Sequence, residues 1–312
     1  MSLSTPISKA YAAAVAYAVI IGFSFIFVKF ALRSTDPVGL LAHRFTVSFA
    51  AANLLALTGW GKFRISGPGF IKLLPIAVFY PSLFFVFQAF GLSRLPSSEA
   101  GIIQAAIPIM TMVLAALFIK EHATVWQKLC ILMSVGGVSF IVVMSGQQTG
   151  TGTAKLTGYI LILLSAFSSA VYNVMARKLT QTYRVAEMTY IMMGIGFVVF
   201  NAISLSQHAV RGTLADYFEP FADMRFVISI LYLGLLSSLL TSYLTNYALS
   251  HIQASQMSVF INLSVLVTIS AGILVLRETL AWHHFAGAVL ILGGVIGVNV
   301  RGNRYKKRHF RT

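Results

Sequence analysis

The sequence contains little cysteine and little charge. A single cysteine, Cys130, excludes a disulfide within the chain. Only 8 of the 312 residues are acidic and 10% are charged, whereas soluble domains carry about 25% charged residues. Hydrophobic residues make up 57% of the chain, and the mean hydropathy is +0.82. A globular core could not bury so many apolar residues, so we expect an all-α integral membrane protein.

Other absences narrow the function. No phosphate-binding loop of the G-x-x-x-x-G-K-S/T type is present, which argues against direct use of ATP. We predict no cofactor and no metal, because adjacent His283 and His284 would point about 100° apart on a helix. No cleavable signal peptide is evident, so the first apolar run is expected to be a span. The net charge of +15 lies mainly in loops and the tail, which indicates topology and not nucleic-acid binding.

Ten apolar segments are long enough to cross a bilayer, which takes about 20 residues as a helix. Lys and Arg are more frequent in the loops that share a side with the two termini, which predicts cytoplasmic termini. Residues 301–312 form a basic cytoplasmic tail. The expected spans are roughly 11–32, 37–59, 70–91, 97–119, 124–144, 156–176, 185–206, 226–247, 254–276 and 281–300.

The two halves of the chain repeat each other at an offset of 157 residues. Glu121 and Glu278 each follow a basic residue at the end of an apolar run, and LSRLPSSEAG (92–101) falls on LSHIQASQMS (249–258). Gly-Gly pairs coincide as well. We therefore predict two five-helix repeats, 11–145 and 155–300. Because five is odd, the second repeat must be inverted in the membrane.

Inverted repeats favour a transporter over a receptor or a membrane enzyme. Two similar halves can pack in two near-equivalent ways, which expose a site near the bilayer midplane to either side in turn. This is alternating access. A membrane enzyme acting on lipid-linked phosphates and a receptor that moves no solute remain the alternatives from other classes.

The chain resembles the bacterial ten-helix carriers of the drug/metabolite transporter superfamily that have two EamA-type domains. This resemblance implies a bacterial cell membrane and a cavity lined by spans one, three, four, six, eight and nine. Ile21 stands where the family usually has tryptophan, and Val265 where a proline would echo Pro108. The motifs that carry the resemblance are Gly22, Ser24, Phe25 and Lys29, Asp36-Pro37, Arg44-Phe45, Gly91–Ser98, Ala248–Ser255, Pro108, Glu121, Glu278 and the Gly-Gly pairs.

Polar side chains within the expected spans are candidates for the substrate cavity, because polar groups are costly inside a bilayer. For each serine and threonine the alternative is packing between helices. The candidates for the substrate cavity are Tyr80, Gln88, Gln104, Tyr172, Asn173, Ser238, Ser242, Asn246 and Asn262.

A second set is expected to act in gating or structure: His43, Arg44, Glu99, Pro108, Glu121 and Glu278. Two alternatives are open for Arg44, extension of its side chain outward or pairing with Asp36. Glu99 is expected to cap its own helix, with proton coupling left open. Pro108 frees a carbonyl near Gln104 and can kink the fourth span. Glu121 and Glu278 are expected to anchor or gate helix ends.

The distribution of acids bears on the substrate. The first span contains no acid, and none of the eight acids is placed at mid-membrane, so a buried cation would lack a counter-charge. This favours a neutral or zwitterionic metabolite, such as an amino acid, with export as the expected direction. Nucleosides, sugars and amines remain alternatives. The expected partners are the small-molecule substrate and the lipid bilayer, and a monomer is the working hypothesis.

Overall fold

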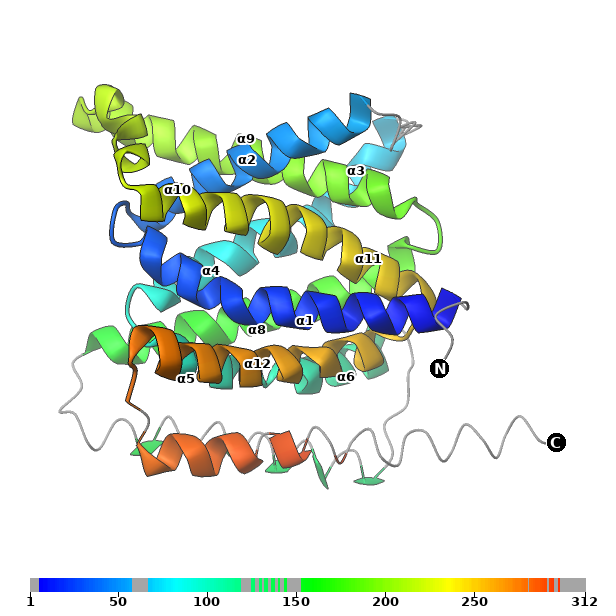
Figure 1. The fold of residues 1–312 in the computed structure, drawn as a ribbon. Helices are drawn as coiled ribbons and strands as arrows, with labels where there is room; N and C mark the ends of the chain where they lie inside the picture. The colour runs from blue at the N-terminus through cyan, green and yellow to red at the C-terminus, as the bar shows by residue number, and fades with distance from the viewer. Residues whose placement is uncertain are drawn as a thin grey trace.

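The computed structural model describes most of the chain. The described residues are 6–57, 67–118, 125–126, 129–130, 132–133, 136–137, 140, 143–144, 153–279, 281–290, 292–294 and 297. Within them the regular structure is all helical, and the helices run side by side along one direction (Figure 1). About half of the predicted fifth span and the whole predicted tail lie outside the described residues.

Five long helices form the frame of the bundle. Proline stands in the first turn of the first two, where its missing N–H is not needed. Asp36 precedes α2, and its carboxylate accepts a 2.6 Å hydrogen bond from the Gly39 backbone N–H. At the end of α9, Gly212 has a φ of 70°, the left-handed conformation that closes many helices. The five are α1 (Pro6–Ala31), α2 (Pro37–Leu57), α8 (Thr153–Leu179), α9 (Val185–Arg211) and α12 (Ala254–Leu276).

Three further spans are discontinuous. The third comprises α3 (Gly67–Ala77), the short segment η1 (Val78–Leu83), which is kinked at Tyr80, and α4 (Phe84–Leu92). The fourth is divided into α5 (Ser97–Gln104) and α6 (Ile107–Phe118). The eighth comprises α10 (Met224–Leu231), the π-helical η3 (Tyr232–Leu240) and α11 (Thr241–His251). A 3₁₀ helix, η2 (Leu214–Ala222), precedes the eighth span.

Seven helices of the described residues are long and apolar enough to cross a membrane, with a shorter apolar helix at Leu263–Leu276. This shorter helix is part of α12, and α12 has the predicted bounds of the ninth span. Residues 282–290, at the start of the predicted tenth span, are helical as well. A multi-pass helical membrane protein is thus confirmed, while the ten-helix inverted arrangement stays a prediction.

The offset of 157 residues reappears in the helix boundaries of spans three, four, eight and nine. The segments η1 and η3 end at Leu83 and Leu240, and the helices that follow the next loops begin at Ser97 and Ala254. Both pairs are 157 residues apart. This correspondence in local structure supports an internal repeat over these spans.

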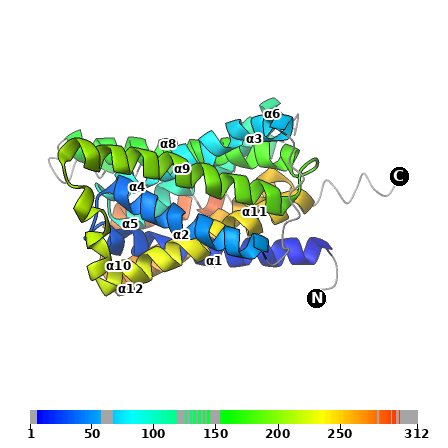
Figure 2. The same ribbon diagram turned by 90° about the horizontal axis from the view of Figure 1, so that it is seen from above.

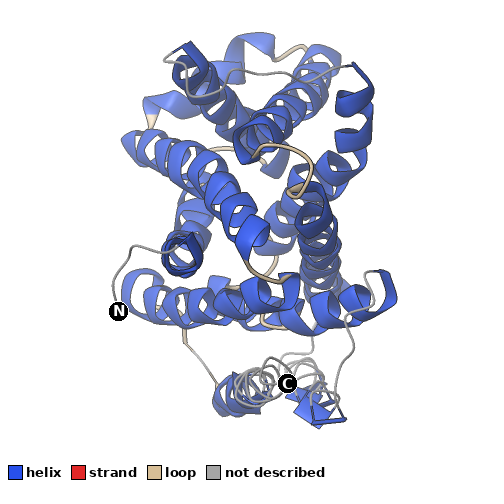
Figure 3. Cartoon of the chain, turned by 90° about the vertical axis from the view of Figure 1, so that its right-hand side faces the viewer, coloured by secondary structure: helices blue, strands red, loops and turns tan. Residues whose placement is uncertain are grey.

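The two halves of the chain are in close contact along α1 and α12. A Cβ atom added at Gly22 would lie 2.5 Å from Cβ of Val267, so only glycine fits at this crossing. The Thr268 hydroxyl donates a 3.0 Å hydrogen bond to the Gly22 carbonyl oxygen. Viewed from above, α1 lies along one edge of the bundle, and α12 packs against it (Figure 2). Figure 3 shows the same bundle along the helices, from the end at which the N-terminus lies. The first and second halves therefore share one interior.

Candidate functional site

Arg44 is buried where α2 meets η3. Its side chain is 1% exposed, and Nε donates a 2.6 Å hydrogen bond to the Ser238 hydroxyl. Nη2 donates to the carbonyl oxygen and to the hydroxyl of Ser237, each at 3.0 Å. The guanidinium carbon lies 4.0 Å from the centre of the Phe85 ring. All these neighbours are uncharged.

Both alternatives that the sequence left for Arg44 are wrong. The side chain points into the protein, and no Asp or Glu of the described residues lies within 4 Å of it. Asp36 instead caps α2 through Gly39. The reason is that Ser237 and Ser238 on η3 accept hydrogen bonds from Nε and Nη2 in the interior.

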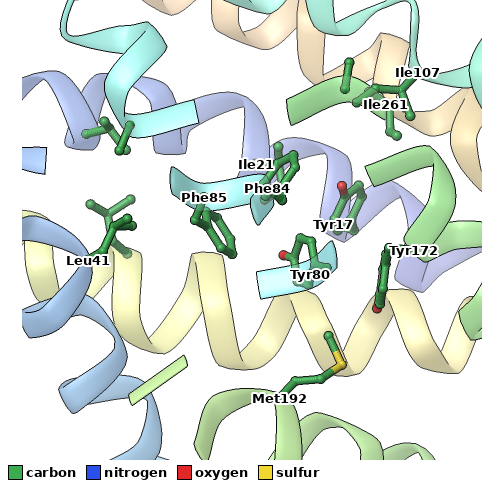
Figure 4. Close-up of a cluster of buried hydrophobic side chains, with 14 of the residues drawn as sticks. Tyr17, Ile21, Leu41, Tyr80, Phe84, Phe85, Ile107, Tyr172, Met192 and Ile261 are labelled. Carbon is green, nitrogen blue, oxygen red and sulfur yellow. The ribbon is translucent and has the colours of Figure 1, made fainter. Parts of the chain in front are cut away.

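A tyrosine pair lies further along η3 and α11. The rings of Tyr80 and Tyr172 are stacked, with centroids 4.5 Å apart (Figure 4). The Tyr172 hydroxyl donates a 3.0 Å hydrogen bond to Oδ1 of Asn246, whose Nδ2 lies 3.3 Å from the Thr189 hydroxyl. The Tyr80 phenol lies beside the hydroxyls of Thr241 and Ser242.

Together these side chains form a continuous buried polar row along η3 and α11. It contains three predicted cavity residues of the eighth span and the aromatic pair from spans three and six. We name it the polar seam and define it as Arg44, Tyr80, Tyr172, Thr189, Ser237, Ser238, Thr241, Ser242 and Asn246.

A smaller polar group joins α4, α5 and α8. Gln104 Nε2 lies 3.4 Å from the Ser165 hydroxyl, which donates a 3.0 Å hydrogen bond to the Phe84 carbonyl oxygen. The break between α5 and α6 falls directly after Gln104, about one turn before Pro108, where the proline cannot donate a backbone hydrogen bond. Asn173 Nδ2 is buried and has no partner among the described residues. These groups give the interior a second polar surface.

A cavity of about 540 Å³ opens at the end of the bundle where α1, α4 and α12 end and α2 begins. We name it the vestibule. Its charged side chains are two bases, Lys29 and Arg33, and two acids, Asp36 and Glu278. The vestibule is lined by Lys29, Leu32, Arg33, Thr35, Asp36, Pro37, Leu92, Ser93, Leu276 and Glu278.

Glu278 caps a helix of the other half. Its carboxylate accepts hydrogen bonds from the backbone N–H and the hydroxyl of Ser97, both at 2.8 Å. It also accepts from the N–H and hydroxyl of Ser98, at 2.9 and 2.6 Å. Burial raises the pKa of Glu278, but the hydrogen bonds from Ser98 and Ser97 outweigh it, so the pKa lies below its ordinary value. Here Glu278 joins the end of α12 to the start of α5.

Glu99 does not cap its own helix, as the sequence suggested, because Glu278 occupies that position. The Glu99 carboxylate instead accepts a 2.6 Å hydrogen bond from the Tyr159 hydroxyl. It also lies 3.3 Å from Lys155 Nζ and 3.5 Å from His284 Nε2. Its partners are 56 to 185 residues away in the chain, and no local pattern could indicate them.

The remaining predicted residues are separate from the polar seam. His43 is buried and contacts the ring of Tyr217, with centroids 4.6 Å apart, which holds η2 against α2. Gln88 is buried on α4. Glu121 and the side chain of Asn262 lie outside the described residues. The described residues contain no cluster of three or more His, Cys, Asp or Glu that could hold a metal.

Sequence reasoning missed three members of the polar seam: Ser237, Thr241 and Thr189. Ser237 and Thr241 are four residues apart and directly precede the predicted pair Ser238 and Ser242. A helix with hydroxyls at two adjacent positions in each turn presents a wide polar face, and that width was the available signal. Thr189 follows no such pattern.

A bundle of membrane-spanning helices with a buried polar row and a cavity at one end has the layout of a membrane carrier. The profile of the EamA-like transporter family matches residues 8–143 and 156–300, one copy in each half. The chain belongs to this family, and it is a membrane transporter and not an enzyme.

Individual proteins agree with this placement. The "Uncharacterized transporter YcxC" of Bacillus subtilis (strain 168) is 54% identical over 301 residues, which cover 96% of each chain. The "Probable amino-acid metabolite efflux pump" of Salmonella typhimurium is 26% identical, over 93% of this chain and 94% of that protein. One solved crystal structure superposes with a TM-score of 0.68 at 17% identity, covering 96% of this chain and 99% of that one. This last likeness supports the fold alone.

Proposed function

We propose that this transporter exports a small neutral or zwitterionic metabolite, an amino acid or a related compound, from the bacterial cytoplasm. It would do so by alternating access around the polar seam, with both termini in the cytoplasm. On this orientation the vestibule opens to the outside.

The observation that carries the proposal is the polar seam itself. Hydroxyl, phenol and amide groups line the junction of α8, α11 and η1 in the interior of a membrane protein, where such groups are costly unless they serve a purpose. The seam contains no carboxylate, so nothing in it would balance the charge of a lipophilic cation. The relatives named as amino-acid metabolite efflux pumps support the same solute class.

The vestibule gives the seam a route to one membrane face. From Pro37 at its margin, α2 descends about two turns, roughly 10 Å, to Arg44 at the end of the seam. The side chains between the two are packed, and Arg44 is 1% exposed. Packed side chains therefore separate the polar seam from the vestibule, as we expect of a carrier whose binding site is closed to that side.

Counterflow tests the proposal. Proteoliposomes containing the purified chain would be preloaded with a pool of amino acids, and uptake of each labelled amino acid would be measured in turn. Tyr172→Phe removes the hydroxyl that bonds Asn246, and Tyr11→Phe is the matched control on a side chain that is 37% exposed.

We expect saturable uptake of at least one amino acid, reduced about tenfold in Tyr172→Phe and unchanged in Tyr11→Phe. Saturable flux of nucleosides, sugars or amines, without amino-acid flux, would remove the proposed substrate class and keep the carrier. An ionophore added to the same vesicles then distinguishes ion coupling from facilitated export.

A further inference from the structure

Arg44 carries a positive charge that its surroundings do not balance. Among the Lys and Arg residues that the structure describes, it alone is fully buried. Its partners are two serine hydroxyls, a carbonyl oxygen and the face of Phe85. Breaking a buried ion pair leaves an uncompensated charge at a cost of several kcal/mol. Arg44 already has a buried charge with no opposite charge beside it, so this charge requires an explanation.

A structural role does not require the charge. The hydroxyl of Ser48, one turn further along α2, donates a 2.9 Å hydrogen bond to the Gly234 carbonyl oxygen of η3. It joins the same two elements through a neutral group. A second brace at Arg44 could likewise be neutral, and a guanidinium is the costlier choice inside a membrane.

The free donors of Arg44 suit a carboxylate. Nε and Nη2 are engaged by Ser238 and Ser237, whereas Nη1 has no hydrogen-bond partner among the described residues. A guanidinium binds a carboxylate through two parallel hydrogen bonds, which an amine or a neutral amide cannot form. One of the N–H groups of Arg44 that now bonds a serine can also turn to the carboxylate. The serine hydroxyl that it leaves can still donate to a backbone carbonyl oxygen of its own helix.

The position of Arg44 suits a solute that enters from the vestibule. It lies at the end of the polar seam nearest the vestibule, about two turns from the cavity margin at Pro37. From there the seam continues through Ser238 and Ser242 to the phenol of Tyr80. A small molecule held at Arg44 would extend its other end along these neutral groups.

We propose that Arg44 binds the carboxylate of the transported solute and thereby restricts transport to carboxylate-bearing molecules, either zwitterions or organic acids. This inference rests on the proposed function for its site. It removes solutes without a carboxylate from the proposed class and adds organic acids to it. Amines without a carboxylate are then excluded as substrates, since they would place a second positive charge beside the unbalanced positive charge of Arg44.

Thermal unfolding of the purified full-length chain tests this binding without transport. The probes are the standard L-amino acids, lactate and pyruvate, each compared with its carboxamide. We expect at least one carboxylate to raise the melting temperature by about 3 °C or more at saturation. Its carboxamide should have no such effect.

Variants of Arg44 test whether the guanidinium causes the rise in melting temperature. Arg44→Gln should abolish the response to the carboxylate, and Arg44→Lys should retain a weaker response with the same preference over the carboxamide. Arg94→Gln, on an exposed side chain, is the matched control and should respond like the wild type. Ser48→Ala, which removes the neutral brace, should lower the melting temperature and keep the response to the carboxylate.

Three results would overturn the assignment: equal stabilisation by carboxamides, an unchanged response in Arg44→Gln, or no response to any carboxylate. If Arg44→Gln does not fold, the Arg44→Lys and carboxamide comparisons decide alone. Carboxylate binding that depends on Arg44, together with no amino-acid counterflow, would keep this assignment and remove the amino-acid part of the proposed function.

Discussion

Glu278 caps the helix that begins at Ser97, and through its Oε2 atom it accepts both the backbone N–H and the hydroxyl of Ser98. The two residues are 180 positions apart and belong to different halves of the chain. A carboxylate at the start of a helix satisfies N–H groups that have no partner within the helix. This contact closes one side of the vestibule.

Replacing Glu278 by Gln should therefore destabilise the protein by about 1 kcal/mol, the usual value of a helix cap. The pKa of Glu278 is lowered in the folded protein, so its stabilisation is present above the ordinary glutamate pKa, about 4.3. It is lost as the pH falls through the lower folded value.

The measurement is the melting temperature of wild type and Glu278→Gln between pH 3 and pH 7. The two curves should differ near neutral pH and approach each other below about pH 4. Glu219→Gln, on an exposed side chain of η2, is the matched control. A constant difference at all pH values would contradict the capping role.

Gly22→Ala should destabilise the protein by about 1 to 3 kcal/mol through overpacking. The new Cβ would lie 2.5 Å from Cβ of Val267 and 2.8 Å from the Ser264 carbonyl oxygen, so α1 and α12 would have to separate. Thermal unfolding in detergent measures the loss. Gly136→Ala is the control, because nothing lies within 4 Å of its added Cβ.

Glu99→Gln should cost about 3 kcal/mol, because it leaves Lys155 and His284 near each other without the carboxylate between them. Lys155→Gln should cost less, since the Lys155 side chain is 23% exposed and that of Glu99 is 7% exposed. Chemical denaturation of the two single variants and the double variant measures the coupling. Additive losses would show that the Glu99–Lys155 pair contributes little.

The single natural cysteine makes the orientation testable. In a Cys130→Ser background, a cysteine at Glu219 and another at Arg311 should lie on opposite faces of the membrane. A membrane-impermeant maleimide should label Glu219→Cys in intact cells, and Arg311→Cys only after permeabilisation. The reverse pattern would invert the proposed orientation and place the vestibule on the cytoplasmic side.

Much of the helical framework could be predicted from the sequence, because apolar runs and their ends follow the thickness of the bilayer. The ninth span was predicted at its observed bounds of 254–276. The π-helical segment η3 was not foreseen, since no local residue pattern distinguishes it from an α-helix. The kink at Tyr80 in the third span was not foreseen either.

The site was predicted in part for a related reason. Hydroxyl and amide groups spaced along one helix, such as Ser238, Ser242 and Asn246, are visible in a sequence as a face. Pairings between distant spans are not visible in this way, so the partners that the structure shows for Arg44 and Glu99 were not predicted. Which of these polar residues touch substrate stays a prediction.

The π-helical segment η3 in span eight has a consequence for deletions. A π turn holds one residue more than an α turn, because its hydrogen bonds run from residue i to i+5. Removing one residue from Tyr232–Leu240 would convert the turn to ordinary α-helix. The direction of the Asn246 side chain and of the later side chains would then stay the same. The same deletion in an uninterrupted helix such as α9 would rotate all later side chains by about 100°. The η3 turn is thus a place where the chain can lose one residue while the later side chains keep their direction.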